Sequence, residues 1–103
     1  DGKRIAILVE EGFEDSEFIE TSRAMKEADI KVVVVGSGSK ECYRGKRGNA
    51  TVKVDVVADK VNANDFDAIV VPGGYAPDKM RLHQSMIDLV RNAYNRGKNI
   101  KKL

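Results

Sequence analysis

Short apolar runs alternate with amphipathic and polar segments along this chain. Residues 5–9, 32–35 and 68–71 are three nearly uninterrupted apolar runs. Runs of this length are typical of strands buried on both faces, as in parallel sheets that helices cover. We therefore expect three parallel strands at these positions.

Two segments have the apolar spacing of amphipathic helices. The first covers residues 16–28, with Asp15 as its expected N-cap and acidic Glu17 in its first turn, where the helix dipole favours negative charge. The second covers residues 85–96, with Ser85 as its expected N-cap. The strand–helix–strand order predicts a right-handed crossover and parallel strands.

The remaining segments are less regular. Residues 42–55 contain turn glycines and an apolar alternation, which predicts a small hairpin at the sheet edge, and residues 62–67 predict a short helical turn. A fourth strand should begin near Ile100. Lys101 and Lys102 then stand where a central strand needs apolar residues, so we expect this run to fail as a buried strand.

Together these elements predict an α/β fold, an open parallel sheet of flavodoxin type with helices on both faces. The 103 residues leave little room for a second core, so we expect one domain over residues 1–103. Ligands of such sheets bind beyond the carboxyl ends of the strands, at the switch point between the first and third strands. Residues 10–17 and 72–78 follow those two strands, so both loops should meet there.

Composition excludes several classes of function. The net charge is +2, with 18 basic residues scattered among 16 acidic ones, which argues against a nucleic-acid partner. No apolar run approaches the roughly 20 residues of a membrane span, so we expect no membrane association. Cys42 and His83 are the single cysteine and histidine, too few for a metal site. A lone cysteine suits the reducing cytoplasm, where we expect this protein.

The loop after the first strand argues against nucleotide binding. It carries four carboxylates, those of Glu10, Glu11, Glu14 and Asp15, and one glycine, whereas a phosphate cradle needs glycine-rich backbone N–H groups. A phosphoacceptor receiver domain would carry an aspartate where Pro72 stands. We therefore expect no cofactor.

The loop after the third strand contains Gly73 and Gly74. Their backbone N–H groups suit an oxyanion hole, although a tight turn would explain the same pair. Glu17 is open to two interpretations in the same way, as a reactive group or as a partner of the helix dipole. The residues alone favour the structural interpretation in both cases.

Several of these segments together resemble the ThiJ/PfpI family, which includes PfpI-like intracellular proteases, glyoxalases and stress proteins. The matching stretches are Ile5–Val9 with Gly12–Glu17, Val52–Asp55, Phe66–Gly74 and Ala76–Arg81. They contain a Phe-Glu-Asp-x-Glu motif and a Pro-Gly-Gly motif, in the family's order and at its separations. The resemblance covers nearly the whole chain and implies a fold of the class I glutamine amidotransferase type.

The resemblance also implies roles for three residues. Glu17 matches a buried glutamic acid that hydrogen-bonds a reactive cysteine and holds it as a thiolate. Gly74 matches a glycine whose backbone N–H forms part of the oxyanion hole. Asp78 matches an acidic position that reaches a neighbouring subunit's histidine in PfpI-like hexamers, but it is one methylene shorter than the glutamate typical there.

The nucleophile of the family lies after the next strand, in an Ala-Ile-Cys-His-Gly-Pro type segment. Here that strand reads Ile100-Lys101-Lys102-Leu103. Neither Cys42, expected in a loop at the sheet edge, nor His83, expected in a solvent-facing or capping position, replaces the missing pair. We therefore expect the N-terminal portion of the family domain, truncated before the nucleophile elbow and inactive as it stands.

Two functional hypotheses follow. The first is the N-terminal part of a cysteine hydrolase that acts on carbonyl groups of peptides, glycated side chains or small aldehydes. The second is a non-catalytic flavodoxin-like module, truncated or redesigned, that folds and self-associates. Because an incomplete sheet leaves an open edge, we expect a homo-oligomer, most simply a symmetric dimer that buries this edge.

Overall fold

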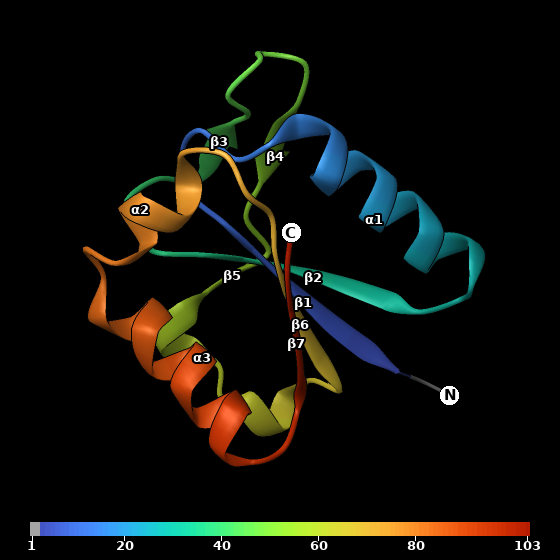
Figure 1. Cartoon of the computed structure of the whole chain (residues 1–103), viewed down its shortest axis with the longest axis vertical. Coiled ribbons are helices and arrows are strands. Elements are labelled where there is room, and N and C mark those ends of the chain that lie inside the picture. Colours follow the sequence, from blue (N-terminus) through green and yellow to red (C-terminus); the bar gives the residue numbers. More distant parts are fainter. Residues whose placement is uncertain (1–2) are drawn as a thin grey trace.

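A computed structural model describes residues 3–103 and contains one five-stranded parallel sheet (Figure 1). Its strand order is β5-β2-β1-β6-β7. The strands are β1 (Arg4–Val9), β2 (Lys31–Gly36), β5 (Val56–Val57), β6 (Ala68–Val71) and β7 (Asn99–Lys102). The three predicted parallel strands are confirmed as β1, β2 and β6.

Helices cover both faces of this sheet. They are α1 (Asp15–Glu27), the short α2 (Ala76–Met80) and α3 (Gln84–Asn95), with 3₁₀ turns η1 (Ala58–Lys60) and η2 (Ala63–Asp65). In Figure 1, α1 lies on one side of the strands and α3 on the other. The predicted flavodoxin-like α/β architecture is confirmed.

The first strand lies at the centre of the sheet. β1 pairs with β2 from Arg4↔Lys31 onward and with β6 from Ile5↔Ala68 onward, both in parallel register. The side chains of residues 6–9 are fully buried, because neighbouring strands flank β1 and helices cover both its faces. The switch point of the sheet therefore falls between β1 and β6, as the sequence predicts.

Both predicted helices form, but neither predicted N-cap is correct. Helix α1 begins at Asp15 and Glu14 is its N-cap, without a side-chain capping bond. Helix α3 begins at Gln84 with His83 as N-cap, so Ser85 lies inside the first turn. The carboxylate of Asp15 is bound elsewhere, as described below.

The hairpin forms as β3 (Cys42–Arg44) and β4 (Thr51–Lys53), paired through Tyr43↔Val52. The sequence predicted that this hairpin lies at the edge of the main sheet. It is instead a separate two-stranded sheet. The edge position belongs to β5 instead. The predicted helical turn in residues 62–67 is confirmed as η2, which Asn62 caps through a 2.9 Å bond from Asn64 N.

The run near Ile100 forms strand β7, but as an exposed strand rather than a buried one, as the sequence predicts. β7 pairs with β6 in parallel over all four of its residues, from Ala68↔Asn99 to Val71↔Lys102. It is an edge strand in the described residues, and its lysines are exposed. Lysine is a common residue on edge strands, where it discourages pairing with other chains, so the two lysines are compatible with this position.

Candidate functional site

The two loops singled out in the sequence meet at the carboxyl end of the sheet. Phe13 and Gly74 form an isolated antiparallel bridge. Two backbone hydrogen bonds close it, from Glu14 N to Gly73 O at 2.9 Å and from Tyr75 N to Gly12 O at 2.8 Å. The loop after β1 and the loop after β6 thus form one connected structure at the predicted switch point.

The contact between the two loops requires glycine at positions 12 and 74. Gly12 and Gly74 have φ angles of +87° and +88°, which other residues rarely adopt. A Cβ on Gly74 would also lie 2.6 Å from Gly12 O and 2.9 Å from Glu14 N. The backbone conformation therefore requires glycine at positions 12 and 74, whatever chemistry these residues perform.

Glu17 reaches from the first turn of α1 to the loop after β6. Its Oε1 accepts a 2.6 Å hydrogen bond from the backbone N–H of Gly73. The glutamate is half-buried. The N–H of Gly73 is thus already engaged by this carboxylate.

The end of β7 lies at the same place. Leu103 N donates a 2.9 Å hydrogen bond to Val71 O. A Cβ on Gly73 would lie 2.9 Å from Leu103 O and 3.2 Å from Glu17 Oε1. The glutamate and the backbone of Leu103 therefore flank the same glycine.

The two other predicted site residues face solvent. Gly74 is exposed, and its N–H takes no part in the two hydrogen bonds of the bridge. Asp78 lies on α2 with 82% of its side chain exposed and pairs with Arg81 Nη1 at 3.1 Å. The structure thus joins Glu17 to the Gly73–Gly74 turn, while Asp78 points to the surface beside it.

The family follows from the sequence as a whole, since residues 3–102 match the sequence model of the DJ-1/PfpI family. The chain belongs to the DJ-1/PfpI family. Among relatives, it is 39% identical over 90 residues to General stress protein 18 of Bacillus subtilis strain 168, an alignment covering 87% of this chain and 52% of that protein. It is 34% identical over 98 residues to Protein/nucleic acid deglycase 2 of Escherichia coli strain K12, covering 95% and 57%.

Solved structures of DJ-1/PfpI proteins share the fold. A two-domain protein from Anabaena variabilis, with DJ-1/ThiJ/PfpI-like and ferritin-like domains, superposes with a TM-score of 0.93 at 42% identity over 97% of this chain and 29% of that one. Drosophila melanogaster DJ-1beta gives a TM-score of 0.87 at 29% identity, over 99% and 55%. The chain spans about half the length of the curated relatives it matches.

In this DJ-1/PfpI chain, Asp15 holds the hairpin against the site. Its buried carboxylate accepts hydrogen bonds from the backbone N–H groups of Arg47 and Asn49 at 2.8 Å and of Ala50 at 2.9 Å. Burial by itself would raise the pKa of Asp15, but the three N–H donors together hold that pKa below its usual value. No sequence signal indicated this role, because the donors lie more than thirty residues away.

The acidic loop is largely neutralised by the basic residues of the hairpin region. Glu14 pairs with Arg47 at 2.9 Å and with Lys46 at 3.5 Å, and Arg47 lowers the pKa of Glu14. Glu11 accepts a 3.1 Å bond from Arg44 N, the main cause of its lowered pKa, and pairs with Lys40 at 3.3 Å. Basic residues of the hairpin region therefore contact this loop of the site.

A buried polar cluster that the sequence did not reveal lies beyond the ends of β1 and β2. Glu10, only 4% exposed, accepts a hydrogen bond from Ser37 Oγ, and its Oε1 lies 3.5 Å from His83 Nε2. The hydroxyl of Tyr43 is 3.0 Å from Ser37 Oγ and 2.8 Å from Ser39 Oγ. His83 is thus half-buried against Glu10, and it is the N-cap residue of α3, so the capping position is the one of its two predicted positions that the structure confirms.

Other chemistry is not indicated by the described residues. Cys42, which was expected in a loop at the sheet edge, is exposed at the start of strand β3. Within residues 3–103, no group of three or more His, Cys, Asp or Glu side chains could hold a metal ion. No helix in the same residues is long and apolar enough to cross a membrane.

Proposed function

We propose that this chain forms the acid and oxyanion-binding half of a cysteine-dependent active site. The substrate class is a carbonyl compound, either a small aldehyde or a glycated amino group. The similarity to deglycases supports the second choice. No metal or cofactor takes part in the proposed chemistry.

One observation carries this proposal. Glu17 Oε1 is bound to Gly73 N at 2.6 Å, and the carbonyl of Leu103 lies beside the same glycine. A nucleophile on a segment continuing from this position would begin beside the Glu17 carboxyl group. The arrangement therefore suits the order of elements that the family resemblance implies, with the cysteine placed after β7.

Three residues, Glu17, Gly74 and Asp78, have roles in the proposed reaction. Glu17 hydrogen-bonds the cysteine and favours its thiolate, which attacks the carbonyl carbon to form a C–S bond. The electron pair of the C=O bond moves to oxygen, and the N–H of Gly74 stabilises that oxyanion. We assign to Asp78, which is exposed on α2, the pairing with a histidine of a neighbouring subunit.

The chain contains one cysteine, Cys42, and its position does not support a role as nucleophile. It lies on β3, exposed, and takes no part in the contact between Glu17 and Gly73. We therefore expect residues 1–103 alone to be inactive toward carbonyl substrates. A single exposed thiol also fits a cytoplasmic location, because it can form no internal disulfide.

The test is a chimera that joins residues 1–103 to the part of Bacillus subtilis General stress protein 18 that follows its aligned residues. Consumption of the methylglyoxal adduct of Nα-acetyllysine, in which the side-chain amino group is glycated, should appear in the chimera and be absent from residues 1–103. Glu17→Gln should lower the rate at least tenfold. Glu20→Gln, the same change at an exposed position of α1, should leave it within twofold.

Two results would contradict this proposal. The first is a chimera with native circular dichroism whose rate is unaffected by Glu17→Gln. The second is activity of residues 1–103 that Cys42→Ser abolishes, since this would make the exposed cysteine the nucleophile.

A second candidate function is that of a non-catalytic assembly module. The observation in its favour is β7, whose outer edge has no partner strand among the described residues. Such an edge can pair with a second copy, giving a symmetric dimer. A monodisperse monomer at tens of micromolar, measured by sizing with light scattering, would exclude this candidate.

A further inference from the structure

A polar cavity of about 460 Å³ lies beyond the carboxyl ends of β2 and β5, two strands that pair in parallel. Ser37 and Ser39 line it from the segment after β2, and Asp59 and Lys60 of η1 line it from the segment after β5. His83, the N-cap of α3, lies on the same cavity, and α3 packs against η1. Ligands of parallel sheets bind at such strand ends. We call this space the Ser37 cavity.

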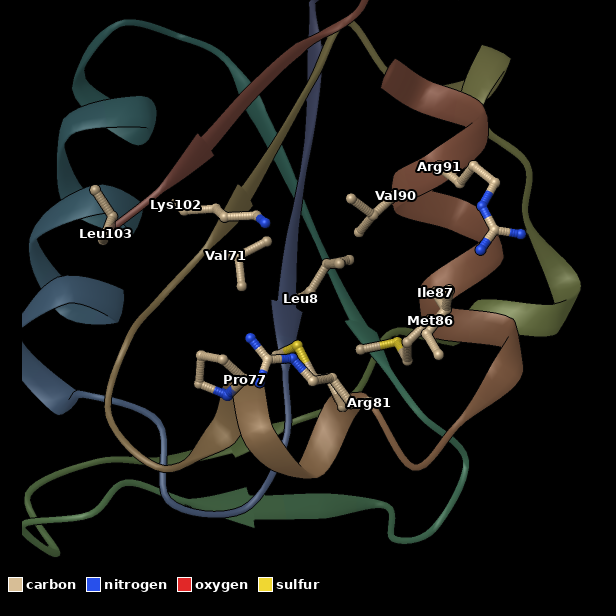
Figure 2. A pocket seen from close by; sticks show the side chains of 11 residues that line it. Leu8, Val71, Pro77, Arg81, Met86, Ile87, Val90, Arg91, Lys102 and Leu103 are labelled. Atoms are coloured by element: carbon tan, nitrogen blue, oxygen red, sulfur yellow. The ribbon is translucent and has the colours of Figure 1, made fainter. Parts of the chain in front are cut away.

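The Ser37 cavity differs in character from the cavity beside α3 (Figure 2). The cavity beside α3 has a volume of about 330 Å³, and Leu8, Val71, Met86 and Val90 are among the side chains that line it. These apolar side chains are poor hydrogen-bond partners for a polar ligand. Most residues that line the Ser37 cavity carry polar or charged side chains instead, so a polar ligand fits there.

A buried network holds the polar groups on one side of the Ser37 cavity. Glu10 is 4% exposed, accepts a hydrogen bond from Ser37 Oγ, and has its Oε1 3.5 Å from His83 Nε2. The hydroxyl of the fully buried Tyr43 lies 3.0 Å from Ser37 Oγ and 2.8 Å from Ser39 Oγ. Glu10 and Tyr43 do not line the cavity themselves, so they hold in place side chains that do. Groups held in this way lose little conformational entropy when a ligand binds.

Two opposite charges lie together on the other side of the cavity. Asp59 and Lys60 are adjacent in η1, and both are exposed. Neither forms an ion pair with another side chain of residues 3–103. Because charge complementarity selects the ligands that a site accepts, this wall suits a ligand with one positive and one negative group. The hydroxyl of Ser39 can donate or accept a hydrogen bond, so it fits either group.

We propose that the Ser37 cavity binds a small zwitterion, a free α-amino acid. Asp59 accepts hydrogen bonds from the ammonium group of this ligand, and Lys60 donates to its carboxylate. The residues that line the cavity do not include Glu17, Gly74 or Asp78. The proposal therefore does not depend on the chemistry proposed for those three residues.

Two other classes of ligand fit less well. A divalent cation needs several oxygen or nitrogen ligands, and no group of three or more His, Cys, Asp or Glu side chains in residues 3–103 could hold one. A phosphate ion would lie beside the carboxylate of Asp59, and a second carboxylate, that of Glu10, is bound to the lining residue Ser37. These two negative charges disfavour an anion that carries no positive group.

NMR titration of the purified chain with L-serine tests this assignment. His83 is the single histidine of the chain, so its imidazole signals report on the cavity without overlap. A ligand of so few atoms should bind with a Kd on the order of 1 mM. We expect saturable shifts of the imidazole signals and of the backbone amides of Ser39 and Lys60. Ethanolamine lacks the carboxylate and glycerate lacks the amino group, so each should bind about tenfold more weakly.

Substitutions of exposed residues identify the charges that bind the ligand, and they should leave the fold intact. Asp59→Asn and Lys60→Gln should each weaken L-serine binding by about threefold or more, because each removes one of the two opposite charges. The control is Lys101→Gln, the same change at an exposed residue of β7 that does not line the cavity. It should leave the Kd unchanged within about 1.5-fold.

Three results would overturn the proposal. The first is the absence of saturable shifts at about 20 mM L-serine, far above the expected Kd. The second is binding of ethanolamine or glycerate as tight as that of L-serine, since one charge would then suffice. The third is an effect of Lys101→Gln as large as that of Lys60→Gln, because binding would then follow the net charge of the chain. Catalysis is not a readout, so failure of the proposed function would leave these results unaffected.

Discussion

The carboxylate of Asp15 fills the space that a side chain at Gly45 would need. A Cβ built on Gly45 would overlap with both carboxylate oxygens of Asp15. The φ angle of Gly45 is not in the left-handed region, so the backbone conformation does not require glycine there. Glycine is required there because the carboxylate of Asp15 lies so close. This contact ties the first loop of the site to the hairpin.

Gly45→Ala should therefore lower the free energy of unfolding. Inserting a methyl group into a closely packed position costs about 1–3 kcal/mol, and here it must also displace a carboxylate that accepts three hydrogen bonds. Denaturant unfolding of the purified chain measures the change. The control is Gly48→Asn, because nothing lies within 4 Å of a Cβ there and asparagine tolerates its φ of +75°. Equal stability of the alanine variant and the wild type would contradict the described contact.

Asp15 should make the chain sensitive to acid. Its pKa in the folded state is lowered, so it contributes stability above its unfolded pKa of about 3.9 and loses this contribution as the pH falls through the folded value. Asp15→Asn should reduce stability at pH 7 by about 2 kcal/mol. The difference between variant and wild type should shrink below pH 4. A difference that stays constant from pH 2 to 7 in urea unfolding would refute this assignment.

Removing the Glu17 carboxylate should loosen the turn after β6. Glu17→Ala leaves the N–H of Gly73 without its 2.6 Å acceptor, which should cost about 1–3 kcal/mol. Glu17→Gln keeps an acceptor oxygen and should cost less. Amide hydrogen exchange at Gly73 is the direct measurement, and we expect faster exchange in the alanine variant than in the glutamine variant. Equal exchange in both would show that the hydrogen bond does not hold the turn.

The polar cluster around Glu10 should contribute to stability through Tyr43. Tyr43→Phe removes the hydroxyl that accepts from Lys40 N at 3.1 Å and bonds Ser37 and Ser39, so we expect a loss of about 1–2 kcal/mol. Tyr75→Phe removes the same group from a side chain that is 61% exposed and should change stability by less than about 0.5 kcal/mol. Thermal unfolding of the two variants gives the comparison. A larger loss for Tyr75→Phe would be incompatible with the described burial.

The sheet was predictable because its strands are short and apolar on both faces. Few other secondary structures fit such a pattern. Because the segments that follow the first and third strands meet at the switch point of the sheet, Glu17 was expected near Gly74. The pairing of the fourth strand with β6 at an edge was not predicted. Lys101 and Lys102 were judged by the requirements of a central strand, and no local signal shows that β7 lies at an edge of the described sheet.

Contacts over long sequence separations were beyond prediction. Asp15 looked like an N-cap because aspartate commonly caps helices, yet its hydrogen-bond donors come from the turn between β3 and β4. Glu10 looked like one of several loop carboxylates, and its burial depends on Ser37 and Tyr43. The structural roles of both carboxylates depend on hydrogen-bond partners that are distant in the sequence and that the fold brings next to them.

The central place of β1 has a consequence for how the chain folds. Strand β1 lies between β2 and β6, so its second row of hydrogen bonds needs residues 68–70, more than sixty positions later. Closing so long a loop costs entropy before any contact compensates for it, which slows folding. A nascent chain that stops before residue 68 would hold an apolar strand with one side unpaired, in the state most prone to aggregation.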